Sequence, residues 1–149
     1  MKITYKEGDV CQASEAIIAH GCNAQGVMGS GVAKFVREKW PAAYQKYNYK
    51  HQTLGLEMGE VVWYFDGTKY IANCITQDKF GYDSKLYCDY DAIRASLQRV
   101  YDYAKNLGLT AVAMPQIGAG RGGGDWNVIA AIIEEVFVDV EPVVYLFKE

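Results

Sequence analysis

Residues 17–36 read IIAHGCNAQGVMGSGVAKFV, and this stretch decides the expected fold. A short apolar run ends at His20, four glycines follow between residues 21 and 31, and a helical pattern begins near Gly31. An apolar run bounded by turn residues is typical of a buried strand, and apolar residues at i, i+3 and i+4 indicate a helix. The stretch therefore predicts a strand, a glycine-rich loop and a helix in direct succession.

Residues 110–126, TAVAMPQIGAGRGGGDW, repeat this organisation, with a strand, a glycine-rich loop over 115–124 and a helix from 126. Glycine lets a backbone approach a ligand closely, and the unpaired amides at a helix start favour an anion. In open α/β sheets such loops meet beyond the carboxyl ends of the strands. The two loops therefore predict one crevice suited to a diphosphate; the alternative is that the glycines only form tight turns.

The rest of the chain alternates between strands and helices, which predicts an α/β fold with helices on both faces of a sheet. The Asp66-Gly67 pair predicts a hairpin, so we expect a mixed, mostly parallel sheet of about six strands. A polar segment over 76–89 predicts a long functional loop. The expected strands are 2–6, 16–21, 59–65, 69–75, 110–114 and 143–147, and the expected helices are 31–40, 42–50, 90–107 and 126–137.

Length and composition limit the class of protein. The 149 residues suit a single domain over 1–149, and the net charge of −3 with dispersed basic residues argues against binding to duplex nucleic acid. No apolar run reaches about 18 residues, and residues 1–10 carry no signal-peptide pattern. We expect a cytoplasmic monomer without a membrane segment.

The four cysteines, Cys11, Cys22, Cys74 and Cys88, form no C-x-x-C pair. We therefore expect free thiols and no metal site. Cys22 lies in the first glycine-rich loop, where it is either a nucleophile or a small packed residue.

The second loop also matches the dinucleotide fingerprint at Gly118-x-Gly120-x-x-Gly123. That fingerprint requires an acidic residue after the next strand and several further strands, so it is a weak match here. No G-x-x-x-x-G-K-[ST] motif is present, which excludes a P-loop nucleoside triphosphatase.

Together the segments EGDVCQASEAIIAHGCNAQGVMGSGVA (7–33) and MPQIGAGRGGGDW (114–126) resemble the macrodomain family, whose members bind ADP-ribose. The resemblance implies a three-layer α/β/α fold, and it is closest to the branch that processes ADP-ribose 1''-phosphate. The chain is also similar to the terminal ADP-ribose protein glycohydrolase branch, which uses a lysine shortly after its Ile-Thr pair. Here Ile75-Thr76 is followed by Gln77, and Lys79 is displaced.

The resemblance also implies which residues bind the ligand. Asp9, followed by Val10, should accept a hydrogen bond from the adenine amino group, and Asn23 should bond the distal ribose. Asp9 and Asn23 have structural alternatives as turn-forming residues, and Tyr145 either stacks near the adenine or belongs to the core. The loop residues expected around the diphosphate and distal ribose are Gly29, Ser30, Gly31, Val32, Ile117, Gly118, Ala119, Gly120, Arg121 and Gly122.

The candidate residues for catalysis are His20, Asn23 and Asp125. His20 ends a strand beside Asn23 and titrates near neutrality, so it is a candidate general base, or else a buried structural histidine. Asp125 either activates water or only caps a helix. The expected reaction is hydrolysis of ADP-ribose 1''-phosphate without a cofactor. The alternatives are an ADP-ribosyl hydrolase, an O-acyl-ADP-ribose deacylase and a non-catalytic binding module.

Overall fold

The computed structural model describes residues 1–81, 83 and 85–147. Positions 82 and 84, in the loop expected over 76–89, lie outside the described residues. The elements in chain order are β1 (Thr4–Glu7), the short 3-10 helix η1 (Val10–Gln12), β2 (Ile17–Asn23), α1 (Gly31–Lys39), α2 (Pro41–Thr53), β3 (Val61–Phe65), β4 (Tyr70–Gln77), α3 (Tyr90–Asn106), β5 (Ala111–Met114), α4 (Trp126–Val136) and β6 (Glu141–Leu146).

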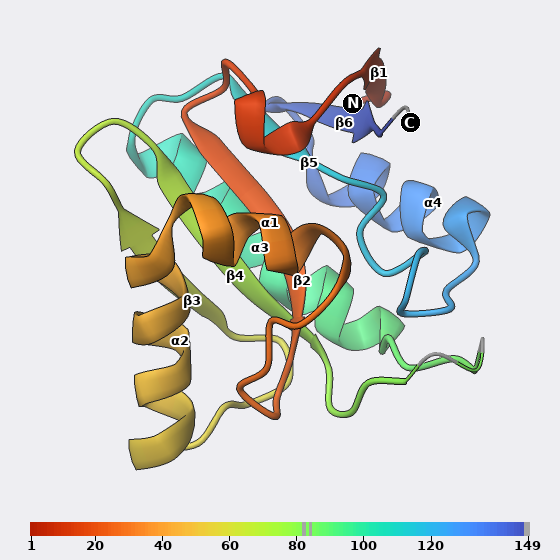
Figure 1. Ribbon diagram of the computed structural model, residues 1–149. Helices are drawn as coiled ribbons and strands as arrows, with labels where there is room; N and C mark the ends of the chain where they lie inside the picture. The colour runs from red at the N-terminus through yellow and green to blue at the C-terminus, as the bar shows by residue number, and fades with distance from the viewer. Residues whose placement is uncertain (82, 84, 148–149) are drawn as a thin grey trace.

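The strands form one six-stranded mixed sheet in the order β1-β6-β5-β2-β4-β3 (Figure 1). Only β3 runs antiparallel to its neighbour, β4, and the hairpin between them turns at Gly67 with φ +98°. The Asp66 carboxylate accepts hydrogen bonds from the amides of Thr68 and Lys69 and so holds this turn. The mixed, mostly parallel sheet expected from the sequence is confirmed.

Helices cover both faces of the sheet, which gives the expected three layers (Figure 1). Successive side chains of a strand point to opposite faces, and β2 follows this rule. Ile17 and Ala19 pack in the cluster formed with α3 and α4, whereas Ile18 packs against Val36 and Trp40 on the other face. Each fully buried isoleucine side chain stabilises the fold by about 1.5–3 kcal/mol.

The helix ends follow the local sequence. Asp89 caps α3 by accepting a hydrogen bond from the amide of Ala92, and Gly108 adopts φ +71° just after the helix ends. Pro41 occupies the first position of α2, so the chain turns between α1 and α2 at Trp40. No helix within the described residues is long and apolar enough to cross a membrane.

Strands β2 and β4 run two residues further than expected, and their ends are not in simple register. Cys22 pairs with Ile75, but the next residue, Asn23, pairs with Gln77. Thr76 is therefore the extra residue on β4. Such irregularities bend a strand and re-aim a side chain, often beside a functional site. The shift lies at the carboxyl edge of the sheet, where both glycine-rich loops leave their strands.

Candidate functional site

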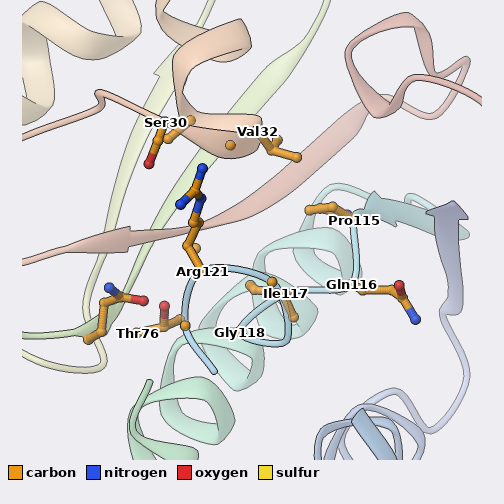
Figure 2. A pocket seen from close by; sticks show the side chains of 14 residues that line it. Ser30, Val32, Thr76, Pro115, Gln116, Ile117, Gly118 and Arg121 are labelled. Atoms are coloured by element: carbon orange, nitrogen blue, oxygen red, sulfur yellow. The ribbon is translucent and has the colours of Figure 1, made fainter. Parts of the chain in front are cut away.

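A crevice lies at the carboxyl edge of the sheet and consists of three adjoining pockets. The largest, the central pocket, has a volume of about 350 Å³ and is lined by both glycine-rich loops and by Thr76 and Gln77 (Figure 2). It shares Ser30 and Arg121 with a pocket of about 80 Å³ that we call the Asn23 pocket. On the other side it shares Val32 with the Asp9 pocket, which has a volume of about 170 Å³.

One wall of the central pocket is the N-terminus of α1. Ser30 is the N-cap residue, yet its side chain makes no capping hydrogen bond. The first bond into the helix turn runs from the Lys34 amide to the Ser30 carbonyl, so the amides of Gly31, Val32 and Ala33 are not used within the helix. Unpaired amides and the helix dipole make this end of α1 attractive to an anion.

The opposite wall is the second glycine-rich loop, which folds back on itself. The Gly118 carbonyl accepts a hydrogen bond from the Gly124 amide at 2.8 Å. A Cβ on Gly122 would lie 2.6 Å from the same carbonyl oxygen, so this position requires glycine for packing. A Cβ on Gly120 would meet nothing within 4 Å, and this residue lines the pocket. Gly122 is therefore structural, whereas Gly120 offers its backbone to the crevice.

The sequence pattern predicted that the second loop brings the N-terminus of α4 to the crevice. In the structure that helix end lies outside the three pockets. Asp125 caps α4 itself by accepting a hydrogen bond from the Asn127 amide at 2.9 Å. Neither Asp125 nor Trp126 lines any of the three pockets. Asp125 thus has the helix-capping role that was the alternative to a catalytic one. The glycine-rich loop separates the start of α4 from the pocket.

The floor of the central pocket is made by Gly21, Thr76 and Ile117. Thr76 is 1% exposed, and its hydroxyl has no hydrogen-bond partner among the described residues. A Cβ on Gly21 would lie 2.8 Å from the Thr76 hydroxyl oxygen, so the glycine leaves room for that side chain. A buried hydroxyl without a partner costs about 1–3 kcal/mol, which a bound oxygen or amide group can recover.

The Asn23 pocket is built around an asparagine that organises its own loop. The Asn23 side-chain oxygen accepts hydrogen bonds from the Gln25 amide at 2.9 Å and from the Tyr47 hydroxyl at 3.0 Å. Its amide nitrogen donates to the Val27 carbonyl at 2.8 Å. This is the loop-forming alternative that the sequence left open. Asn23 still lines the pocket, so its remaining N–H is the group available for a ligand.

The Asp9 pocket is lined by one carboxylate and by aromatic side chains. One oxygen of Asp9 accepts a hydrogen bond from the Cys11 amide at 2.9 Å and caps η1, and Asp9 also lines the pocket. The rings of Phe35 and Phe147 stack at a centroid distance of 6.3 Å at its rim. Val10 and Tyr145 complete the predicted residues of this pocket. The combination of a carboxylate acceptor and flat apolar surfaces suits a purine with an exocyclic amine.

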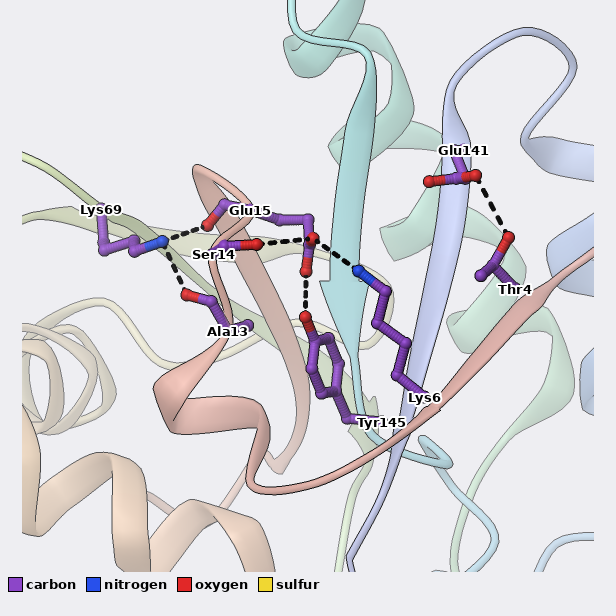
Figure 3. Close-up of polar contacts among 8 residues, drawn as sticks. All are labelled: Thr4, Lys6, Ala13, Ser14, Glu15, Lys69, Glu141 and Tyr145. Carbon is purple, nitrogen blue, oxygen red and sulfur yellow. Dashed lines mark hydrogen bonds and ion pairs between the residues drawn. The ribbon is translucent and has the colours of Figure 1, made fainter.

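Tyr145 is held by a polar network behind this pocket (Figure 3). Its hydroxyl donates to Glu15 at 2.5 Å, and Lys6 lies 3.7 Å from the same carboxylate. Burial and the neighbouring Glu15 raise the pKa of Tyr145 to about 12. Lys69 donates to the carbonyls of Ala13 and Glu15 and so fastens this segment to the β3–β4 hairpin. The hydroxyl is thus occupied, and only the ring of Tyr145 is available to a ligand.

His20 lies in the core and not in the crevice. Its side chain is fully buried, it lines none of the three pockets, and it bonds to Asn73 at 2.6 Å. Burial lowers its pKa from 6.5 to about 4. A general base must reach the proton that it abstracts, so burial outside the three pockets argues against that role for His20. Its partner Asn73 donates to the Ala43 carbonyl of α2, so His20 belongs to a buried polar contact between the sheet and α2, as the structural alternative supposes.

The four cysteines are free thiols, and all four are buried. Cys22 borders the Asn23 pocket, but burial raises the pKa of its thiol well above the usual value. The thiol therefore stays protonated and is a packed residue rather than a nucleophile. Within the described part of the chain, no group of His, Cys, Asp and Glu residues is arranged to hold a metal ion.

The predicted loop residues gather as expected, with one exception: Ala119 lines none of the three pockets. Sequence reasoning missed a second group of pocket residues, most of which lie at strand ends or contribute apolar walls. Thr76 could have been identified, because it follows the apolar run 69–75, which predicts a buried strand ending at the same edge of the sheet. The pocket residues that were not predicted include Gly21, Ala33, Phe35, Thr76, Gln77, Phe80, Pro115, Gln116 and Phe147.

Comparison with known proteins gives relatives that match along nearly the whole chain. The DNA ADP-ribosyl glycohydrolase of Mycobacterium tuberculosis is 29% identical over 96% of this chain, but the chain spans only 42% of that relative's length. The ADP-ribose 1''-phosphate phosphatase of Scheffersomyces stipitis is 29% identical over 97% of this chain and 99% of its own length. A solved protein of unknown function from Bacteroides thetaiotaomicron superposes with a TM-score of 0.88 at 30% identity, covering 98% of both chains.

These matches agree with the architecture of the crevice, in which two glycine-rich loops meet at the carboxyl edge of a mixed six-stranded sheet. The family model of the Macro domain matches residues 19–133, a range that contains both loops and the strand end at Thr76. The chain therefore belongs to the Macro domain family.

Proposed function

We propose that this chain binds ADP-ribose in the three-pocket crevice and hydrolyses the phosphate ester of ADP-ribose 1''-phosphate. The central pocket carries the proposal, because the amides of α1 and of the second loop line it from opposite sides while no carboxylate lines it. Such a surface suits a diphosphate. The similarity to an ADP-ribose 1''-phosphate phosphatase over nearly the full length of both chains supports the choice of substrate.

The order of the pockets gives the direction of the ligand. The Asp9 pocket takes the adenine, whose amino group donates to the Asp9 oxygen that is not used in capping η1. The central pocket takes the diphosphate, and the Asn23 pocket takes the distal ribose. A ligand in this direction places the carbon that bears the 1''-phosphate beside Gly29, Phe80 and Arg121.

The residues around the distal ribose limit the mechanism. Among the described residues, no Asp, Glu, His or Lys lines the Asn23 pocket. We therefore assign the base to the substrate, whose own phosphate oxygen accepts a proton from the attacking water. The water oxygen forms a bond to phosphorus as the ester P–O bond breaks, and the proton passes to the departing ribose oxygen. Positioning by Asn23 and stabilisation of charge by loop amides are the contributions of the protein.

The test is an assay of inorganic phosphate and ADP-ribose released from ADP-ribose 1''-phosphate. The wild-type chain should release both in equal amounts and with multiple turnovers, and a Gly120→Val variant should not, because its side chain would fill the central pocket. Absence of turnover by a wild-type chain that binds ADP-ribose would reject the phosphatase and leave an ADP-ribosyl hydrolase or a binding module.

A second candidate is release of ADP-ribose from a macromolecule. The similarity to a DNA ADP-ribosyl glycohydrolase over 96% of this chain favours it. Gln77, in place of a lysine after the Ile-Thr pair, argues against it, since an amide can act neither as an amine nucleophile nor as a cationic acid. Mono-ADP-ribosylated DNA and protein, assayed beside ADP-ribose 1''-phosphate, separate the two activities.

A further inference from the structure

Arg121 lies where the central pocket meets the Asn23 pocket. It belongs to the lining of both pockets, and its side chain extends from the second glycine-rich loop toward Ser30 on the first loop (Figure 2). A Cβ on Gly31 would lie 4.0 Å from the Arg121 Cγ, so the aliphatic part of the side chain passes close to the start of α1. The guanidinium group is therefore held at the junction between the two loops.

The charge at this junction is distinctive. Of the described residues that line the central and Asn23 pockets, Arg121 alone carries a charge, and the remainder are neutral. The amides at the start of α1 and in the second loop can hold one anionic group in the central pocket. The start of α1 also borders the Asn23 pocket through Ser30 and Ala33, so a second anionic group there would share that helix end with the first and would need a further positive charge, which Arg121 supplies. A guanidinium group offers two parallel N–H donors, which match two oxygens of a phosphate group.

We infer that the Arg121 side chain is a specificity-determining group that binds a terminal phosphate on the distal ribose. The crevice then selects ADP-ribose derivatives that carry a phosphomonoester at the distal end over ADP-ribose itself. This inference rests on the proposed function, and it assigns the diphosphate to the backbone amides and the terminal phosphate to a side chain. The aromatic ring of Phe80 also lines the Asn23 pocket and provides an apolar boundary for the phosphorylated ribose.

The experiment compares the affinities for ADP-ribose, by calorimetry, and for ADP-ribose 1''-phosphate, by calorimetry or by KM where turnover occurs. Arg121→Gln should weaken the binding of ADP-ribose 1''-phosphate about tenfold more than that of ADP-ribose, because a charge-assisted bidentate contact is lost. Arg121→Lys should recover part of this selectivity through its charge. Lys79→Gln removes an exposed cation outside the three pockets and should leave the selectivity unchanged.

The outcomes distinguish this inference from the proposed function. A wild-type chain that binds neither compound rejects the proposed function. A wild-type chain that binds ADP-ribose and its 1''-phosphate equally well overturns the inference and leaves the proposed function intact. Equal losses of both affinities in Arg121→Gln would assign the side chain to the diphosphate and also overturn it. The thermal midpoint of each Arg121 and Lys79 variant shows whether the substitution leaves the fold unchanged.

Discussion

The Nε2 atom of His20 lies 2.6 Å from the side-chain oxygen of Asn73, between two neighbouring parallel strands in the core. The amide oxygen of Asn73 is an acceptor, so Nε2 carries the proton. The Asn73 side-chain nitrogen donates in turn to the Ala43 carbonyl at 3.4 Å. This chain of bonds ties β2 and β4 to α2 directly beneath the Asn23 loop.

The buried His20 predicts a loss of stability in acid. Its pKa is lowered from 6.5 to about 4 by burial, so the unfolded chain binds a proton before the folded one does. The contribution is complete above pH 6.5 and is lost as the pH falls toward 4. From pH 7 to pH 5 the free energy of unfolding should fall by about 2 kcal/mol through this group. Urea unfolding should show a smaller fall in His20→Gln, and equal falls in the two proteins would contradict this account.

Asp125 predicts a change in stability without a change in chemistry. Asp125→Ala removes the cap on the Asn127 amide, and the free energy of unfolding should fall by about 1 kcal/mol. Asp125→Asn keeps a capping oxygen and should recover most of the loss. The rate of phosphate release per folded molecule should not change. A hundredfold fall in kcat at saturating substrate would make Asp125 a catalytic residue after all.

Two glycines of the second loop predict opposite effects. Gly120→Val places its side chain in the open pocket, so ADP-ribose binding should be abolished while the thermal midpoint is kept. Gly122→Ala places a methyl group 2.6 Å from the Gly118 carbonyl, which forces the backbone to move. This should lower the free energy of unfolding by about 1–3 kcal/mol. Normal binding by Gly120→Val would show that the loop does not line the site.

Replacing Thr76 should lower the affinity for ADP-ribose without lowering the stability of the fold. Thr76→Val removes a buried hydroxyl that has no partner within the described residues and replaces it with a methyl group of similar shape. The free energy of unfolding should stay equal or rise by about 1 kcal/mol, whereas the affinity for ADP-ribose should fall about fivefold. Thr110→Val, at an exposed threonine just before β5 and outside the three pockets, controls for a threonine-to-valine change that is remote from the crevice. Loss of stability with unchanged affinity would assign the hydroxyl a purely structural role.

Local patterns were sufficient to predict the architecture. The Asp66-Gly67 turn, the cap at Asp89 and the Trp40-Pro41 break each reflect chemistry within a few residues, and the structure has all three features. The two glycine-rich loops could be placed at one edge because parallel strands end at the same edge of a sheet.

The parts of the site that could not be predicted depend on contacts between distant segments. The register shift that turns Thr76 into the central pocket exists only once β2 pairs with β4. The position of His20 depends on which face of β2 receives α2. Alternation along the strand shows which residues share a face, but not which helix covers that face. Phe147 contributes to the Asp9 pocket because it packs on Phe35, more than one hundred residues earlier in the chain. Spacing could have placed Thr76 after a strand end, but residue type and spacing do not show the register shift, the face of β2 that receives α2 or the contact between Phe35 and Phe147.

Calorimetric titration of the wild-type chain with ADP-ribose and, separately, with AMP tests the central claim most directly. The account predicts a Kd for ADP-ribose near 1 μM, or about −8 kcal/mol, because the ligand fills all three pockets. AMP reaches only the Asp9 pocket and part of the central pocket, so its Kd should be at least about 100-fold weaker, a difference of about 3 kcal/mol. Equal affinities for the two compounds, or no binding of ADP-ribose, would contradict the account.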